Sequence, residues 1–162
     1  MKAPDLIQKK VLTLPALQKV IFQWKWFGKT FAFTNGCFDI LHQGHIFSLS
    51  KAASEADYLV VGLNSDQSVK KLKGPGRPFN NQESRELVLA SLVMVDAVVI
   101  FDEDTPLNLI KTIFPDVMVK GGDYRVSEIA GAGEVIAAGG RVVINPILEG
   151  FSTTSIIEKM KT

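Results

Sequence analysis

The chain has 162 residues, of which 46% are hydrophobic, 22% charged and 9% aromatic. This length fits one compact domain, and the composition excludes an intrinsically disordered chain and a small disulfide-dependent module. The 18 Lys and Arg against 17 Asp and Glu give a net charge of +1, which supplies no field for capturing a nucleic acid or an anionic membrane. With a single cysteine and no apolar stretch of membrane-spanning length, we expect a cytoplasmic protein with neither nucleic acid nor membrane as partner.

The first segment of the chain has the pattern of an amphipathic helix. Apolar residues recur at helical spacing, at Leu17, Val20, Ile21 and Trp24. Gly28 follows the last of them as a terminator. We therefore expect a helical lead-in over residues 1–29 that packs on a single domain formed by residues 30–162.

From residue 31 onward, short apolar segments alternate with helical ones. Strands are expected over residues 31–34, 57–63, 95–101, 116–120 and 141–145, and helices over 44–56 and 81–92, from Thr105-Pro106 onward and after Ser152. Strands that are nearly all apolar are covered on both faces, and their alternation with helices indicates right-handed parallel crossovers. The predicted fold is a Rossmann-like α/β domain, with an open parallel sheet of about five strands and helices on both faces. Ligands bind such sheets beyond the carboxyl ends of the strands.

Two local patterns add detail to this prediction. Thr105 is expected to be the N-cap of the helix that follows it, with Pro106 at its first position and Leu107, Ile110 and Phe114 on one face. The segment Val69–Asn81 carries four basic residues among glycines and prolines, which is typical of a basic mobile loop.

Both histidines of the chain lie in the segment that follows the first strand and opens the first helix. Their three-residue spacing directs both imidazoles to one side of the helix start, where the dipole and the free N–H groups favour an anion. Gly44 lies between His42 and His45 and lets a phosphate approach the backbone. A lone histidine would more often be a helix cap or a packing residue, but two histidines around a glycine favour phosphate binding. No metal site is expected, because no cysteine or third histidine accompanies them.

Two further segments bring polar groups to the same edge of the sheet. Lys120 ends a predicted strand and is followed by Gly121, where a ligand can approach the backbone. A lysine that only extends into solvent at a strand end is the alternative. Ser152–Ser155 supplies hydroxyls and N–H groups at the start of the last predicted helix, where N-capping explains one or two of the hydroxyls and anion binding explains all four.

These segments resemble a known family. His42-Gln43-Gly44-His45 is similar to the HxGH signature of the nucleotidyltransferase superfamily, and the residues 33–41 before it resemble its sugar-phosphate adenylyltransferases. The match continues, in chain order, through residues 61–66, 72–78, 101–106, 119–124 and 149–155. Together they resemble the heptose 1-phosphate adenylyltransferases from about residue 30 to the C-terminus.

The resemblance implies roles for individual residues. His42, His45 and Lys120 would be catalytic. ATP would be bound by Thr34, Asn35, Gly36, Cys37, Phe38, Gly44, Gly121, Ser152, Thr153, Thr154 and Ser155. The sugar phosphate would be bound by Asp39, Lys73, Arg77, Arg85 and Asp123. Three alternatives stay open: Asp39 as a helix cap, Arg85 in a surface ion pair with Glu55 or Asp66, and Asp123 in the metal shell.

The implied reaction transfers AMP from Mg²⁺-ATP to D-glycero-D-manno-heptose 1-phosphate, for lipopolysaccharide core or a related surface glycan. Ile147 stands where cytidylyltransferases of the superfamily usually carry an arginine, which disfavours CTP. The alternatives are a related enzyme that uses glycerol 3-phosphate, a phospho-alcohol or FMN, and a module that binds ATP without turning it over. Many relatives carry a sugar kinase in the same chain. The present sequence of 162 residues is too short to include one, so we expect a separate kinase upstream. Trp24, Trp26 and Phe27 offer an apolar patch for a homodimer.

Overall fold

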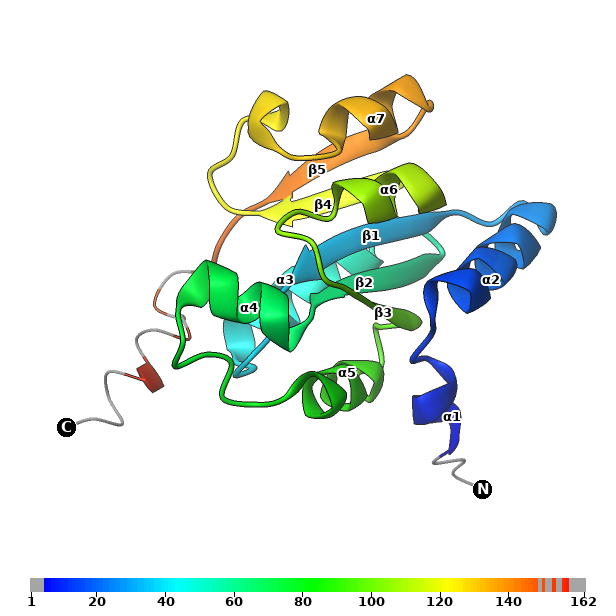
Figure 1. The fold of residues 1–162 in the computed structure, drawn as a ribbon. Coiled ribbons are helices and arrows are strands. Elements are labelled where there is room, and N and C mark those ends of the chain that lie inside the picture. The colour runs from blue at the N-terminus through cyan, green and yellow to red at the C-terminus, as the bar shows by residue number, and fades with distance from the viewer. Residues whose placement is uncertain (1–4, 149, 151–152, 154–155, 158–162) are drawn as a thin grey trace.

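A computed structural model describes residues 5–148, 150, 153 and 156–157 of the chain. Its centre is a five-stranded parallel sheet in the order β3-β2-β1-β4-β5 (Figure 1). The strands are β1 (Phe31–Gly36), β2 (Tyr58–Asn64), β3 (Ala97–Phe101), β4 (Val117–Gly121) and β5 (Arg141–Asn145). The prediction of a Rossmann-like open parallel sheet is confirmed.

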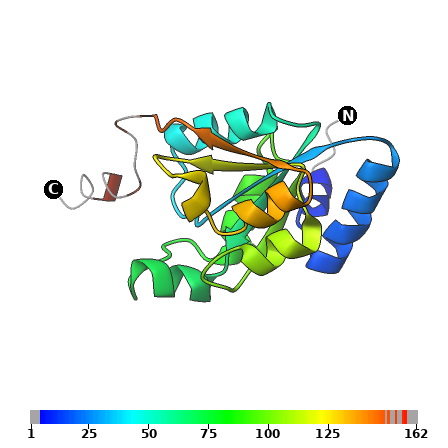
Figure 2. The ribbon, with the colours of Figure 1, turned by 90° about the horizontal axis from the view of Figure 1, so that it is seen from above.

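Helices cover both faces of the sheet. They are α1 (Asp5–Lys9), α2 (Leu14–Trp26), α3 (Gln43–Ala53), α4 (Asp66–Lys73), α5 (Gln82–Ala90), α6 (Leu107–Ile113) and α7 (Ala132–Ala137), with a 3₁₀ turn η1 (Val126–Glu128) before α7. Figure 2 shows α3 on one side of the sheet and α6 and α7 on the other. Each face has its own buried apolar cluster, because the strand residues alternate between the two: Phe33 and Met118 pack with α2, α6 and α7, whereas Val61 and Val119 pack with α3 and α5.

The lead-in packs against the sheet through α2. Its N-cap Thr13 accepts a hydrogen bond from the amide of Ala16 at 3.4 Å, and Leu17 and Ile21 are buried in the core. Gly28, at φ +69°, follows the helix end as predicted. The division of the chain at residue 30 stays a prediction. In the part of the chain that the structure describes, no helix has the length and apolar composition that crossing a membrane requires.

The aromatic residues at the end of α2 point in different directions. Trp24 stacks on Tyr58, with ring centroids 4.1 Å apart, so it packs on the sheet. Trp26 and Phe27 are 76% and 77% exposed. The homodimer that these aromatics suggest stays a prediction.

The predicted basic loop over Val69–Asn81 is wrong in its first half. Lys70, Lys71 and Lys73 lie on α4, which starts from the N-cap Ser65, whose hydroxyl accepts from the amide of Ser68 at 3.2 Å. Val69, on the inner side of this helix, is fully buried. Its burial stabilises the helix despite the charge of the neighbouring lysines. The irregular segment runs from Gly74 to Asn81, between α4 and α5.

The start and end of α6 also differ from the prediction. Pro106, not Thr105, is the N-cap, and no side chain caps the helix. Phe114 adopts a left-handed conformation at φ +46° and ends the helix half-exposed, so it does not share the buried face of Ile110. The short elements α1, η1 and α7 were not predicted, since three to six residues are too few for a periodic pattern.

The strand order places a switch point beside β1. The chain runs outward from β1 to β2 and β3, then crosses back so that β4 pairs with the other side of β1. Crossovers on the two sides of β1 therefore leave in opposite directions, and a crevice opens beyond its carboxyl end. The segment with both histidines begins at this end.

We expect Gly62→Ala to lower the free energy of unfolding by about 1–3 kcal/mol. A Cβ at this position in β2 would lie 2.8 Å from Cζ of the buried Phe33, so the core would have to shift. Urea unfolding measures the change. Gly133→Ala is the matched control: a Cβ there has no neighbour within 4 Å, and alanine in a helix should stabilise by about 0.5–1 kcal/mol. Equal effects of the two substitutions would contradict the expectation.

Candidate active site

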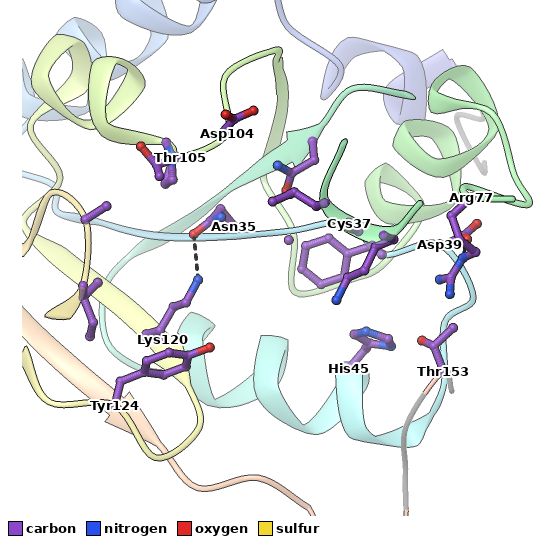
Figure 3. Close-up of a pocket in the computed structure, with 18 of the residues that line it drawn as sticks. Asn35, Cys37, Asp39, His45, Arg77, Asp104, Thr105, Lys120, Tyr124 and Thr153 are labelled. Atoms are coloured by element: carbon purple, nitrogen blue, oxygen red, sulfur yellow. Dashed lines mark hydrogen bonds and ion pairs between the residues drawn. The ribbon is translucent and has the colours of Figure 1, made fainter. Parts of the chain in front are cut away.

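A cavity of about 700 Å³ opens beyond the carboxyl ends of the strands, at the switch point. Figure 3 shows side chains from β1, from β4 and from the residues before α5 converging on it. The predicted site residues that line it are Asn35, Gly36, Cys37, Phe38, Asp39, His42, His45, Lys73, Arg77, Lys120 and Thr153. Residues far apart in the sequence therefore meet in one place.

The two histidines lie together at the start of α3. Their ring centroids are 3.9 Å apart, and His42 is the N-cap of the helix. Nδ1 of His45 accepts a hydrogen bond from the backbone N–H of His42 at 3.3 Å. Among the described residues, the buried Nδ1 of His42 has no hydrogen-bond partner. An imidazole nitrogen that is buried without a partner beside a helix N-terminus is suited to a ligand group.

Both imidazoles are uncharged at neutral pH. Burial and then the charge of the neighbouring His42 lower the pKa of His45 to about 4. Burial also lowers the pKa of His42. Since Nδ1 of His45 accepts the backbone bond, the proton of the neutral ring is on Nε2. Without a ligand, the pair therefore consists of uncharged imidazoles. A phosphate that binds beside them would raise the pKa of both rings and so favour their protonated form.

Phe38 holds an uncommon backbone conformation in the wall of the cavity. Its φ is +45°, in the left-handed region that side chains other than glycine rarely adopt. Its ring is 5.4 Å from that of His45 between centroids. A Cβ on Gly36 would lie 3.0 Å from the ring of Phe38, so the ring closes over this glycine and against the histidine.

Lys120 extends from the end of β4 into the cavity. Its ammonium nitrogen donates to Oδ1 of Asn35 at 3.4 Å (Figure 3) and lies 5.8 Å from the centre of the Tyr124 ring. Burial lowers the pKa of Lys120. Within the described residues no carboxylate forms an ion pair with it. This lysine is a partly buried cation whose charge is available to an anionic ligand.

Asp39 is an anchor for the segment before α5. Its carboxylate accepts from the amides of Phe79 and Asn80, both at 2.9 Å, and from Nε of Arg77 at 2.7 Å. Burial alone would raise the pKa of Asp39, but these hydrogen bonds and the charge of Arg77 outweigh it and hold the pKa below its usual range. Asp39 does not cap α3, whose N-cap is His42. It holds Arg77 at the cavity.

Several predicted site residues lie elsewhere. Thr34, Gly44, Arg85, Gly121 and Asp123 are not among the residues that line the cavity. The alternative of an ion pair between Arg85 and Asp66 is confirmed, at 2.8 Å, but the guanidinium is buried and not at the surface. Of the predicted hydroxyl row, Thr153 lines the cavity and donates to the carbonyl of Ile40 at 3.4 Å. Ser152, Thr154 and Ser155 lie outside the described residues.

Sequence reasoning missed five polar residues of the cavity wall: Asn64, which ends β2, and Asp104, Thr105, Tyr124 and Glu128. Asp104 and Thr105 follow the end of β3, and Tyr124 and Glu128 follow the end of β4. The rule that ligands bind beyond the carboxyl ends of parallel strands was the signal that pointed to both segments.

Cys37 lines the cavity but has no features of a nucleophile. Burial raises the pKa of its thiol above the usual range, against the charges of Lys73 and Arg85. The protonated thiol is unreactive. Its backbone carbonyl, by contrast, accepts a hydrogen bond from Arg85 at 2.6 Å.

The cavity has no built metal cage in the part of the chain that the structure describes, where no three or more His, Cys, Asp or Glu side chains cluster suitably. Asp39 is already engaged by three donors. A divalent cation fits this wall only if it arrives with oxygen ligands of its own, as Mg²⁺ does on a nucleoside triphosphate.

Comparison with known proteins identifies the family. Residues 33–159 match the cytidylyltransferase-like family, a stretch that includes the sheet except for the first two residues of β1, and every residue discussed for the cavity. The chain belongs to the cytidylyltransferase-like family. The prediction of a nucleotidyltransferase from the HxGH resemblance is thereby confirmed.

Curated relatives are similar over nearly the whole chain. The "bifunctional protein HldE" of Mesorhizobium japonicum is 50% identical over 158 residues, which cover 98% of this chain and 32% of that protein. The protein of the same name in Hyphomonas neptunium is 52% identical over 94% of this chain and 31% of its own length. This chain therefore spans about one third of the length of these relatives.

Two solved structures share the fold. A lipopolysaccharide core biosynthesis protein from Thermoplasma volcanium superposes with a TM-score of 0.61 and 26% identity, over 75% of this chain and 98% of its own. A pantoate-beta-alanine ligase from Francisella tularensis has the same TM-score at 16% identity, over 93% and 76% of the two chains. The second likeness shows the fold alone.

The low pKa of His45 predicts how stability depends on pH. An ordinary histidine with a pKa of 6.5 takes up its proton in the unfolded chain, whereas folded His45 takes it up only near 4. Its contribution to the free energy of unfolding should therefore fall as the pH is lowered from 6.5 to 4 and level off below. Urea unfolding of the parent and of His45→Gln across this range measures it. A difference between them that does not change with pH would contradict the assignment.

Proposed function

We propose that this chain transfers AMP from ATP to D-glycero-D-manno-heptose 1-phosphate, giving ADP-heptose and pyrophosphate. The observation that carries the proposal is the meeting of His42, His45 and Lys120 in one cavity of a cytidylyltransferase-like domain. The identity of about half to the HldE proteins and the likeness to a lipopolysaccharide core biosynthesis protein support the substrate class.

The reaction is an in-line displacement at phosphorus. A non-bridging oxygen of the sugar phosphate forms a bond to the α-phosphorus of ATP, and the bond from that phosphorus to the β-phosphate bridging oxygen breaks. The pyrophosphate leaves with the electron pair of the broken bond. Since the attacking oxygen is anionic at neutral pH, no general base is required. The protein therefore has to bring two anions together, align them and offset the charge.

The residues of the cavity fit these tasks. Nε2–H of His45 is free to donate to a phosphate oxygen, because Nδ1 is held by the backbone of His42. Lys120 adds a cation without a carboxylate partner among the described residues, and Arg77 keeps its two terminal nitrogens outside its bond to Asp39. Donors aimed at oxygens that gain charge in the transition state accelerate such transfers.

Mg²⁺ would arrive with ATP, held mainly by phosphate oxygens and water, and would offset the charge of the phosphates. The cavity wall itself is balanced, with Lys73, Arg77 and Lys120 facing Asp39, Asp104 and Glu128. A balanced wall attracts neither anion strongly by net charge. The residues therefore fit a cation that comes with the substrate.

ATP is favoured over CTP by Ile147, two residues after the end of β5. Ile147 is 63% exposed, and its Cδ1 is 3.7 Å from the position of a Cβ on Gly122, beside the ring of Tyr124. This apolar surface lacks the arginine that the resemblance associates with CTP. The proposed acceptor is a sugar phosphate, so another enzyme has to supply it. That a separate kinase supplies it, and that the product enters surface glycan synthesis, stay predictions.

Pyrophosphate release tests the reaction and its substrates together. Purified protein with Mg²⁺ and either ATP or CTP is offered the anomers of heptose 1-phosphate, glycerol 3-phosphate or FMN. We expect release only with ATP and one heptose 1-phosphate. Release with CTP or another acceptor would overturn the proposed substrates but keep the chemistry. Binding of ATP with no release from any acceptor would indicate a nucleotide-binding module instead.

We expect His45→Ala and Lys120→Met each to lower kcat about 100- to 1000-fold, because each removes a donor that faces developing charge. Circular dichroism and thermal unfolding should show a folded protein. Lys111→Met is the control for Lys120→Met: this lysine pairs with Glu134 on the surface, 3.4 Å away, and its loss should leave kcat unchanged. Near-normal turnover of either cavity variant would remove that residue from the catalytic set.

A further inference from the structure

Among the residues that the structure describes, Arg85 is the largest side chain that is fully buried. Its side chain is 1% exposed, although an arginine is almost never buried without partners. Nη1 donates to the carbonyls of Cys37 at 2.6 Å and Asn64 at 2.8 Å, where β1 and β2 end. Nε donates to the carbonyl of Asn80 at 3.0 Å, and Nη2 pairs with Asp66 at 2.8 Å.

This guanidinium joins segments that the sequence keeps apart. It starts from α5 and connects the end of β1, the end of β2, the N-terminus of α4 and the segment held by Asp39. Only a planar group with several donors reaches acceptors on these different sides. Because Arg85 does not line the cavity, any effect that it has on the reaction must pass through these segments.

The contact with Cys37 leads directly to the strained turn. The carbonyl that Arg85 holds belongs to the peptide unit joining Cys37 to Phe38, and Phe38 is the residue at φ +45°. A left-handed phenylalanine is unfavourable and persists only where its surroundings fix it. The charged hydrogen bond at 2.6 Å on the preceding carbonyl is such a constraint.

The turn at Cys37 and Phe38 determines what surrounds the His45 imidazole. The Phe38 ring lies 5.4 Å from the imidazole between centroids and is part of the apolar surface that keeps water from it. We propose that Arg85 is a positioning residue, which holds the Cys37–Phe38 peptide so that the Phe38 ring fixes and shields the His45 imidazole. Its effect on turnover rests on the proposed function, whereas its effect on the imidazole does not.

The other titratable and charged groups around His45 line the same cavity. His42 faces it from the same helix start, with centroids 3.9 Å apart. Cys37 and Asp39 come from the turn after β1, Lys120 from β4, Lys73 from α4 and Arg77 from the segment before α5. Arg85 itself is separated from His45 by the turn. A change at Arg85 that keeps its positive charge therefore acts on the imidazole through structure.

The test measures the pKa of His45 in the nucleotide-free protein by NMR, where two histidines are assigned with a His42→Gln variant. Arg85→Lys keeps the charge but cannot reach all four acceptors. Phe38→Gly accepts the left-handed backbone and removes the ring. Both variants should raise the pKa of His45 from about 4 toward 6.5, because water reaches the ring. For Arg85→Lys, kcat should fall about 10- to 100-fold with a much smaller change in KM for ATP.

Lys10→Met is the control for lost stability. Lys10 also donates to two backbone carbonyls, those of Leu92 at 3.3 Å and Val95 at 2.7 Å, at the opposite end of the sheet from the cavity. Its loss should lower the melting temperature without moving the pKa of His45. If Arg85→Lys behaves in the same way, with an unmoved pKa, Arg85 is only a structural residue and the proposal is wrong.

The double variant tests the route. If Arg85 acts through the Phe38 ring, Arg85→Lys added to Phe38→Gly should change the pKa of His45 no further. Additive changes would overturn this route. Should Arg85→Lys not fold, Phe38→Gly decides alone, since an unchanged pKa in that variant refutes the shielding. Absence of pyrophosphate release in the parent would refute the proposed function but leave the pKa result valid.

Discussion

The arrangement of this molecule depends on the parallel pairing of β1 with strands on both sides. Because β2 and β4 both pair with it, the crossovers separate at β1 and the groups at its carboxyl end are not covered by a helix. The same pairing brings Lys120, near the carboxyl end of β4, within 3.4 Å of Asn35 on β1. The cavity and the approach of Lys120 to it are thus consequences of strand order, whereas the histidine pair is a local feature of the start of α3.

A second constraint is the way in which the fold handles buried charge. Asp39 and Arg85 are both buried, and each is surrounded by partners of the right kind: backbone amides and Arg77 around the carboxylate, carbonyls and Asp66 around the guanidinium. Both groups bind Asn80, Asp39 through its amide and Arg85 through its carbonyl. The segment before α5 is therefore fastened to the turn after β1 from two sides. Removing either charge would leave the other partners unsatisfied, at a cost of about 3–5 kcal/mol.

The sequence predicted the sheet because its strands are apolar and its helices periodic, and it predicted the histidine turn because the residue types are rare and close together. It failed where tertiary packing decides. Lys70 and Lys71 were predicted to lie in a loop, but the burial of Val69 makes the segment helical. Arg85 was predicted to bind substrate or to form a surface ion pair. Its burial was missed because no sequence pattern indicates that four acceptors from separate segments surround it. The left-handed Phe38 is likewise visible only in three dimensions, because no turn motif requires it.

The neutral state of the histidines has a consequence for a reaction between two anions. A permanently charged pair would hold phosphates tightly before and after transfer alike, and uniform binding does not accelerate the chemical step. An imidazole kept uncharged by burial gains its proton most readily when negative charge is close, so its attraction grows with the charge that it faces. The apolar shielding by Phe38 thus makes the charge of the imidazole follow the ligand, which ties the packing of the turn to the chemistry of the cavity.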